Sequence, residues 1–278
     1  MPGHSSLAAK ADVLRQLHRG PKILVLPNAW DVASARMIEE AGAAAIATSS
    51  AGVAFSLGYP DGEKISREEM LAVVARIAAK VKIPVSADLE AGYGKRPEDA
   101  AQTARALMES GAVGLNLEDG TGDRQHPIAD LALQLEKIAA VLETARTAGV
   151  PLVLNARTDM YLREVGSPET RFDEALRRLS AFRNAGADCL FIPGVRDLPT
   201  IERFVRDLRH PINILAGPGS PTILDLQRAG VARVSVGSAP ARAALGLTRR
   251  IAEELLTSGT YRTLEGAPSH AEVNRMLT

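Results

Sequence analysis

The chain has 278 residues, of which 46% are hydrophobic and 4% aromatic, enough for one large domain or two small ones. Its 33 Lys and Arg residues balance 33 Asp and Glu residues, so no overall charge attracts it to nucleic acid or to an anionic membrane. The N-terminal residues lack a charged start followed by an apolar core, and no apolar run is long enough to cross a bilayer. We therefore expect a cytoplasmic protein without nucleic-acid or membrane partners.

Strand-like segments alternate with helical patterns along the whole chain. The strands are expected near 23–28, 44–49, 84–89, 113–118, 152–157, 189–193, 212–216 and 233–237. Each is followed by a helical pattern, near 31–41, 66–81, 97–110, 130–148, 170–185, 197–208, 221–229 and 241–258, and one further helix is expected near 6–18. Glycines such as Gly42, Gly111 and Gly186 follow helical segments directly, where glycine suits the left-handed position past a helix end.

Eight such alternations predict a (β/α)8 TIM barrel, a single domain over residues 1–278 with the extra N-terminal helix across its bottom. An open, doubly wound sheet is the alternative. That fold would leave an edge strand, and its dinucleotide-binding version needs a Gly-x-Gly-x-x-Gly turn after the first strand. Residues 27–31 read Pro-Asn-Ala-Trp-Asp instead, so we favour the barrel.

Acidic side chains follow three consecutive predicted strands. Asp88 and Glu90 are two residues apart and point the same way from a strand end, where their charges repel unless a divalent cation or a shared proton compensates them. Glu118 ends the next strand, and Asp61 follows the preceding one. Acids also gather in ordinary turns, but three successive strand ends favour a cation site with oxygen ligands at the barrel mouth.

Strand five ends in Asn155-Ala156-Arg157-Thr158-Asp159. A guanidinium at the rim can bind a substrate carboxylate or phosphate through two parallel hydrogen bonds. Arg157 can equally form a salt bridge to Glu118 or Asp159 that holds the rim together. The two roles are compatible.

The single cysteine, Cys189, excludes an intrachain disulfide, and its apolar neighbours indicate a buried thiol rather than a nucleophile.

Several of these segments together resemble the isocitrate lyase/phosphoenolpyruvate mutase superfamily. The matching segments are Ser-Ser-Ala-Gly-Val-Ala at 49–54, Gly-Tyr-Pro-Asp at 58–61, Asp-x-Glu-x-Gly-Tyr-Gly at 88–94, Asn-Leu-Glu-Asp at 116–119 and Ala-Arg-Thr-Asp at 156–159. The resemblance extends from about residue 27 to residue 246.

The resemblance implies a metal ion, Mg2+ with Mn2+ as a substitute, held directly or through water by Asp61, Asp88, Glu90 and Glu118. It also implies that backbone amides near Ser49, Ser50 and Ala51 bind the carboxylate of a 2-oxo or 2-hydroxy acid, with Tyr59, Arg124 and Asn155 as further substrate-binding residues. Arg157, Asp61 and His126 are the expected catalytic residues, and members of the superfamily make or consume a pyruvate-like enolate. The last helix is expected to exchange with a neighbouring subunit in a homodimer or homotetramer.

The loop after strand four departs from the pattern of the superfamily's lyases. Those enzymes resemble one another in a Lys-Lys/Arg-Cys-Gly-His stretch, whereas residues 120–130 here contain neither Lys nor Cys. The Asn-Ser pair that marks the mutases is missing too. The loop is polar and contains glycines, which is typical of a mobile lid. Arg124 and His126 can meet the distal end of a substrate, His126 as a proton donor, or both can be solvated loop residues.

We therefore predict a Mg2+-dependent lyase that cleaves the C–C bond beta to the carbonyl of a 2-oxo or 2-hydroxy acid. A P–C bond enzyme, similar to phosphonopyruvate hydrolase or phosphoenolpyruvate mutase, is an alternative with the same enolate core. A barrel that binds a 2-oxo acid without turnover is another. The glycine-containing segments at 215–220 and 236–240 also allow an unrelated phosphate-binding barrel enzyme.

Overall fold

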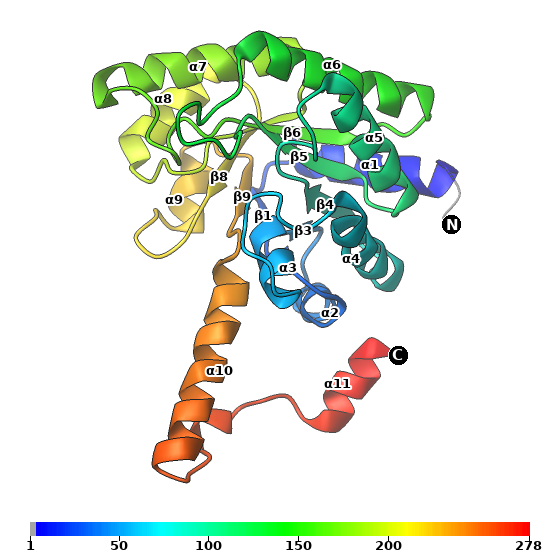
Figure 1. Cartoon of the computed structure of the whole chain (residues 1–278), viewed down its shortest axis with the longest axis vertical. Coiled ribbons are helices and arrows are strands. Elements are labelled where there is room, and N and C mark those ends of the chain that lie inside the picture. The colour runs from blue at the N-terminus through cyan, green and yellow to red at the C-terminus, as the bar shows by residue number, and fades with distance from the viewer. Residues whose placement is uncertain (1–3) are drawn as a thin grey trace.

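The computed structural model describes residues 4–278, and within them nine parallel strands form one sheet in the order β1-β9-β8-β7-β6-β5-β4-β3-β2 (Figure 1). The strands are β1 (Leu24–Leu26), β2 (Asn28–Ala29), β3 (Ile46–Thr48), β4 (Val85–Asp88), β5 (Gly114–Glu118), β6 (Val153–Arg157), β7 (Cys189–Phe191), β8 (Ile212–Leu215) and β9 (Arg233–Ser235). Every predicted strand is present, and the barrel prediction is confirmed.

The sheet curls into a nearly closed barrel because β1 and β2 are two halves of one strand, interrupted at Pro27. Proline has no backbone N–H to donate to a ladder. Below the break, β1 pairs with β9, with Leu24 opposite Arg233. Above it, β2 pairs with β3, with Asn28 opposite Ala47. The first strand therefore joins the two ends of the sheet, and the open doubly wound alternative is wrong.

The side chain of Asn28 completes the closure at the carboxyl ends of the strands. Its Oδ1 accepts hydrogen bonds from the backbone N–H groups of Val236, at 2.8 Å, and Gly237, at 2.9 Å. Its Nδ2 donates to the carbonyl of Thr48 at 2.8 Å. The buried side chain of Asn28 thus links the end of β3 to the segment that directly follows β9, on either side of the first strand.

The helices surround the barrel as predicted, with α1 (His4–Leu17) as the additional N-terminal helix. The others are α2 (Val32–Glu40), α4 (Arg67–Lys80), α5 (Pro97–Glu109), α6 (Leu131–Thr147), α7 (Pro168–Asn184), α8 (Leu198–Leu208), α9 (Ile223–Arg228) and α10 (Ala239–Thr257). Leu14 of α1 is fully buried, and a Cβ added to Gly114, at the start of β5, would lie 2.8 Å from its side chain. The amino ends of the strands are therefore covered by α1.

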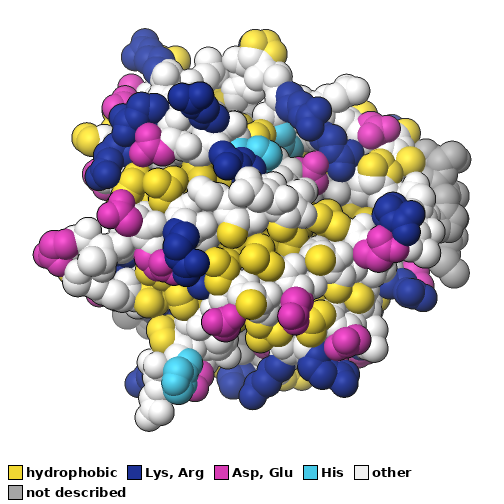
Figure 2. All heavy atoms as spheres, turned by 90° about the horizontal axis from the view of Figure 1, so that it is seen from above, with side chains coloured by type: hydrophobic (Ala, Val, Ile, Leu, Met, Phe, Trp, Pro, Cys, Tyr) yellow, Lys and Arg dark blue, Asp and Glu magenta, His cyan; other side chains and the backbone are white. Residues whose placement is uncertain are grey.

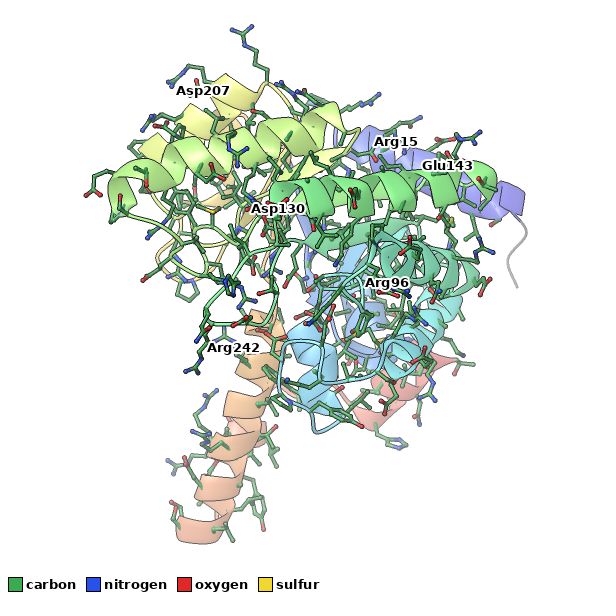
Figure 3. The ribbon with its side chains drawn as sticks, turned by 45° about the horizontal axis from the view of Figure 1, so that its top comes forward. Arg15, Arg96, Asp130, Glu143, Asp207 and Arg242 are labelled. Atoms are coloured by element: carbon green, nitrogen blue, oxygen red, sulfur yellow. The ribbon has the colours of Figure 1, made fainter. Side chains whose placement is uncertain are left out.

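Three short helices were not predicted, namely α3 (Ser50–Ser56), the 3₁₀ helix η1 (Arg262–Leu264) and α11 (His270–Leu277). Figure 1 shows α10 extending away from the barrel, with α11 returning toward α2. Arg242 lies near the start of α10, where the helix leaves the barrel, and Asp130 lies at the beginning of α6 (Figure 3).

The surface agrees with the balanced composition. On the face shown in Figure 2, basic and acidic side chains alternate around a band of hydrophobic ones, and neither sign of charge dominates. Among residues 4–278, no helix is both long and apolar enough to cross a bilayer.

Candidate active site

Asp88, the last residue of β4, is held at the barrel mouth by hydrogen bonds to both of its carboxylate oxygens. Its Oδ2 accepts from the hydroxyl of Ser50 at 2.7 Å and from the backbone N–H of Ser50 at 3.3 Å. Its Oδ1 accepts from Nδ2 of Asn116 at 3.4 Å. Ser50 is the first residue of α3, so the positive end of that helix faces this carboxylate.

The unpredicted helix α3 explains how the segment 49–51 is arranged. Ser49 caps the helix, because its hydroxyl accepts from the backbone N–H of Gly52 at 3.2 Å. Ser50 and Ala51 then form the first turn, where backbone N–H groups have no partner within the helix. The N–H of Ser49 donates to the carbonyl of Ala29 at 3.0 Å and that of Ser50 to Asp88. Of the three amides expected to bind a carboxylate, that of Ala51 therefore remains at the helix N-terminus, a position suited to an anion.

Glu90 is buried, with 5% of its surface exposed. Its Oε2 accepts from the backbone N–H of Glu63 at 2.6 Å, and its Oε1 has no hydrogen-bond partner within the described residues. Burial, followed by the charges of Asp88 and Asp61, raises the pKa of Glu90 to about 8. Desolvation and the charge of Asp88 also raise the pKa of Asp61, although that residue lies at the exposed edge of the mouth.

These carboxylates lie close enough to perturb one another, but they do not form a direct metal cage. Among residues 4–278, no three Asp, Glu, His or Cys side chains are arranged to contact one ion together. Mg2+ typically keeps several waters and takes only one or two carboxylates directly. The crowded carboxylates and the unpartnered Oε1 of Glu90 therefore fit a hydrated Mg2+ ion.

Arg157, at the end of β6, forms the ion pairs that the sequence suggested. Its guanidinium lies 2.7 Å from Oε2 of Glu118, and its Nε lies 2.6 Å from Oδ1 of Asp159. Burial disfavours its charge, but Glu118 and Asp159 outweigh that effect and raise the pKa of Arg157. Burial raises the pKa of Glu118 well above its usual value despite this neighbour. Arg163 contributes a second cation, 3.0 Å from Oδ2 of Asp159.

A buried network behind Arg157 was not predicted. Asp119 is fully buried and accepts hydrogen bonds from the hydroxyl of Thr158 at 2.7 Å, the backbone N–H of Asp159 at 2.9 Å and Nε of Arg178 at 2.8 Å. Burial raises the pKa of Asp119, and Arg178 opposes the shift. The network fixes the backbone that follows β6, and with it the position of Asp159 beside Arg157. The only feature of the sequence that points to this network is Asp119 itself, the acid directly after Glu118.

Two predicted substrate-binding residues lie apart from the acidic group. Asn155 is buried inside the barrel and donates from Nδ2 to Oδ1 of Asn116 at 2.8 Å. The hydroxyl of Tyr59 donates to Oε1 of Glu69 at 3.2 Å, in an exposed pair. The structure therefore links Asn155 to the site through Asn116, whereas Tyr59 is directed toward α4.

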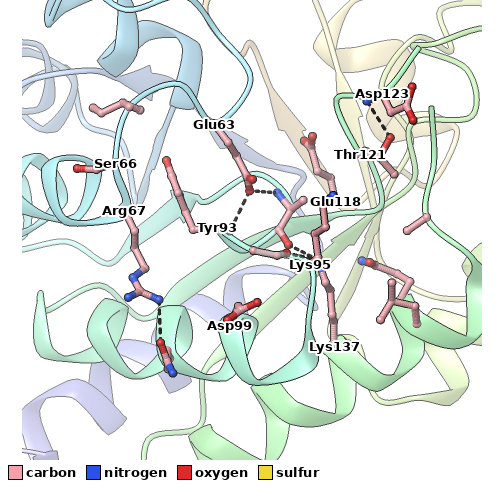
Figure 4. A pocket seen from close by; sticks show the side chains of 18 of the residues that line it. Glu63, Ser66, Arg67, Tyr93, Lys95, Asp99, Glu118, Thr121, Asp123 and Lys137 are labelled. Atoms are coloured by element: carbon pink, nitrogen blue, oxygen red, sulfur yellow. Dashed lines mark hydrogen bonds between the residues drawn. The ribbon is translucent and has the colours of Figure 1, made fainter. Parts of the chain in front are cut away.

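A cavity of about 760 Å³ opens beside Glu118, between the loops that follow β3, β4 and β5 (Figure 4). His126 lines it together with Glu63, Tyr93 and Lys137. The imidazole of His126 is exposed and lies 3.4 Å from Oδ2 of Asp123, and Arg124 is exposed in the same loop. Sequence reasoning missed Lys137, which donates to the carbonyls of Ala91, at 2.9 Å, and Gly94, at 2.8 Å, and so holds the loop after β4.

The protein is a parallel (β/α) barrel with a cluster of carboxylates and arginines at the carboxyl ends of its strands. This is the face on which enzymes of the barrel class carry their active sites. Within this class, the model of the phosphoenolpyruvate phosphomutase family matches residues 14–256. The chain belongs to this family, and the predicted relationship is confirmed.

Two curated relatives illustrate the range of the family. The chain is 37% identical to the Mycobacterium tuberculosis protein Rv1998c over 230 residues, which cover 82% of this chain and 83% of that protein. It is 28% identical to oxaloacetate decarboxylase 2 of Pseudomonas fluorescens, with coverage of 91% and 87%.

Two solved structures share the whole fold. A candidate lyase/mutase from Burkholderia cenocepacia has a TM-score of 0.91 and 40% identity, and the match covers 98% of this chain and 96% of that one. A phosphonopyruvate hydrolase, solved with oxalate and Mg2+, has a TM-score of 0.84 and 25% identity, with coverage of 96% and 94%.

Proposed function

We propose that the protein is a Mg2+-dependent lyase that cleaves the C–C bond beta to the carbonyl of a 2-oxo or 2-hydroxy acid. The observation that carries this proposal is the group Asp61, Asp88 and Glu90. Burial, followed by the charges of the neighbouring carboxylates, raises the pKa values of Asp61 and Glu90, and Asp88 accepts from the hydroxyl of Ser50 at the N-terminus of α3. A cation compensates the carboxylates, and a helix N-terminus suits the carboxylate of the substrate.

The residues of this chain divide the work as follows. The backbone amide of Ala51, in the first turn of α3, orients the substrate carboxylate, because the amide of Ser50 already donates to Asp88. Arg157 stays charged beside Glu118 and Asp159 and balances negative charge at the mouth. Asp88, Asp61, Glu90 and Glu118 would hold a Mg2+ ion directly or through water, with Mn2+ as a substitute. When bound, the ion would supply electrostatic stabilisation of negative charge on the 2-oxo oxygen.

Proton transfer is assigned to His126, which lines the cavity beside Glu118. The loop that carries it closes over the substrate and excludes water. Cys189 takes no part, because its side chain is fully buried in β7 and burial raises the pKa of its thiol to about 12. A thiol that remains protonated at neutral pH is a poor nucleophile.

We also propose that α10 packs on a neighbouring subunit, in a homodimer or homotetramer. The helix extends away from its own barrel (Figure 1), and Ala241 is its only buried residue. Leu245, Leu255 and Leu256 are exposed, the last by 86%. Exposed apolar side chains on one element indicate a contact surface. The molar mass in solution, from light scattering, tests this, and a monomer at micromolar concentration would refute it.

The activity is tested with purified protein and Mg2+ on oxaloacetate, 2-methylisocitrate and phosphonopyruvate, with pyruvate release as the first readout. C–C cleavage of either of the first two supports the proposal. Release of pyruvate and phosphate from phosphonopyruvate alone supports the P–C alternative, which the similarity to the phosphonopyruvate hydrolase makes worth testing. Calorimetry with oxalate, a pyruvate-enolate mimic, identifies a protein that binds without turnover.

A further inference from the structure

Arg233, the first residue of β9, is a fully buried cation without an acidic partner. Its side chain has no exposed surface, and within residues 4–278 no carboxylate lies in salt-bridge distance, whereas Arg157 and Arg178 are both paired. Burial lowers the pKa of Arg233 to about 10, so it remains charged at neutral pH. An unpaired buried charge is destabilising, which raises the question of what it does.

The contacts of Arg233 cross the interior of the barrel. Its Nη2 donates to Oγ of Ser86, in β4, and to Oδ1 of Asn116, in β5, each at 3.4 Å. Neither strand is next to β9 in the sheet, so the side chain reaches beneath the mouth from the opposite wall. Its Nε and Nη1 have no partner among the described residues.

Asn116 receives two donors on one atom. Its Oδ1 accepts from Arg233 and also from Nδ2 of Asn155, the latter at 2.8 Å. The two ends of an asparagine amide have nearly the same shape, so hydrogen bonds decide which way it faces. With Oδ1 directed at the two donors, Nδ2 faces Asp88 and donates to its Oδ1 at 3.4 Å. The reverse orientation would place an oxygen against the carboxylate.

We propose that Arg233 is a positioning residue for the cation site, acting on Asp88 through Asn116. Asn116 then orients Oδ1 of Asp88 while Ser50 orients Oδ2, so the carboxylate is held from both sides. This inference rests on the proposed Mg2+ site. Partners that orient a metal ligand typically change metal affinity by about 10-fold to 100-fold when removed.

The test measures Mg2+ affinity by calorimetry and melting temperature without metal. Arg233→Met is expected to raise the melting temperature by about 2 °C or more, because the unpaired charge is removed, and to weaken Mg2+ binding by about 10-fold. Loss of a nearby positive charge alone would strengthen Mg2+ binding. The direction in which the affinity changes therefore distinguishes a positioning role from a purely electrostatic one. Ser235→Ala is the control, because Ser235 is two residues further along β9 and bonds to Asn213 rather than Asn116.

A double-mutant cycle with Asn116→Ala completes the test. If Arg233 acts through Asn116, Arg233→Met causes no further loss of affinity in the Asn116→Ala protein. Equal or tighter Mg2+ binding by Arg233→Met, or additive losses in the double variant, would overturn the inference. If Arg233→Met does not fold, Arg233→Lys replaces it, because the shorter side chain keeps a cation but loses the reach to Asn116. Weaker Mg2+ binding by this variant would support the inference, and unchanged binding would overturn it. Absence of Mg2+ binding by the wild-type protein would instead refute the proposed function.

Discussion

Glu63 binds the side chain of Glu90 and the backbone that follows Glu90, and so holds two loops together. The backbone N–H of Glu63 donates to Oε2 of Glu90 at 2.6 Å, and Oε1 of Glu63 accepts from the backbone N–H groups of Ala91, at 3.1 Å, and Tyr93, at 2.8 Å. Glu63, Glu90 and Tyr93 all have positive φ, between 51° and 56°. Non-glycine residues adopt this conformation only when their surroundings enforce it, so the loop that carries Glu90 depends on Glu63.

Glu63→Ala tests this dependence. It removes the acceptor of two backbone donors, and we expect a loss of about 2 kcal/mol or more in the free energy of unfolding, with Mg2+ affinity lowered by about 10-fold. Glu63→Gln keeps an oxygen at the same place and should remain close to wild type in both measurements. Chemical denaturation and calorimetry give the two values. If Glu63→Ala and Glu63→Gln had the same stability and Mg2+ affinity, the conformation of the loop would not depend on Glu63.

Asp88→Asn should abolish Mg2+ binding without unfolding the protein. Removing one charge from a crowded group of acids relieves repulsion, so the melting temperature without metal should stay the same or rise. Asp197→Asn is the control, because Asp197 caps α8 through a 2.9 Å bond from Thr200 N–H and is not one of the proposed metal ligands. We expect it to leave Mg2+ affinity unchanged. Wild-type affinity in Asp88→Asn would exclude this residue as a ligand.

Cys189 should be dispensable for activity. Its thiol is buried and its pKa is about 12, so an alkylating reagent should react with it only after unfolding. Mass spectrometry of the alkylated native protein and a parallel activity assay check both points. Rapid inactivation against which substrate protects would place the thiol at the active site.

The loop residues His126 and Arg124 should affect different kinetic constants. His126→Ala is expected to lower kcat more than it raises KM, because a proton donor acts in the transition state. Arg124→Ala is expected mainly to raise KM for substrates with a distal anionic group. Gln125→Ala in the same exposed loop provides the control for general disturbance. Wild-type constants in both variants would show that these side chains are only solvated.

His18 should make the fold sensitive to acid. It is buried, with its Nδ1 2.8 Å from the carbonyl of Leu14, and burial, followed by the charge of Arg233, lowers the pKa of His18 to about 4. The unfolded chain then binds this proton more readily than the folded protein, so stability falls as the pH drops from about 6.5 toward 4. The full effect is about 3 kcal/mol.

Urea unfolding of wild type and His18→Gln across this range isolates the contribution of His18. The stability difference between the two proteins should change between pH 6.5 and 4 and remain constant above pH 7. A His18 ring signal that titrates near pH 6.5 by NMR would contradict the prediction.

The strands and most helices were predictable because each carries a local signal, an apolar run for a strand or a glycine after a helix. The helix α3 carries none, since Ser-Ala-Gly-Val-Ala-Phe-Ser is short, small and buried at five positions, and therefore shows no polar face. Tertiary contacts also fix the conformation at Glu63 and Glu90, which no local pattern encodes.

The order of acids along the chain correctly located Asp88, Glu90 and Glu118 at the mouth, because parallel strands align their carboxyl ends. Sequence order did not reveal Arg178 behind Asp119 or Arg233 beneath Asn116. Each arginine comes from an element distant in the chain, and a charged residue in a helix or strand usually faces water. Tyr59, which the resemblance suggested as a substrate-binding residue, directs its hydroxyl to Glu69, and its role stays a prediction.

The closure of the barrel by Asn28 has a consequence for how the molecule opens. At the base of the seam, backbone pairing between β1 and β9 holds the ring, but at the mouth one side chain satisfies Val236 N–H, Gly237 N–H and the Thr48 carbonyl. Local opening of the barrel is therefore expected to start between the first and last strands, at their carboxyl ends. Amide hydrogen exchange at Val236 and Gly237 would then report the opening of the active-site rim long before the sheet itself separates.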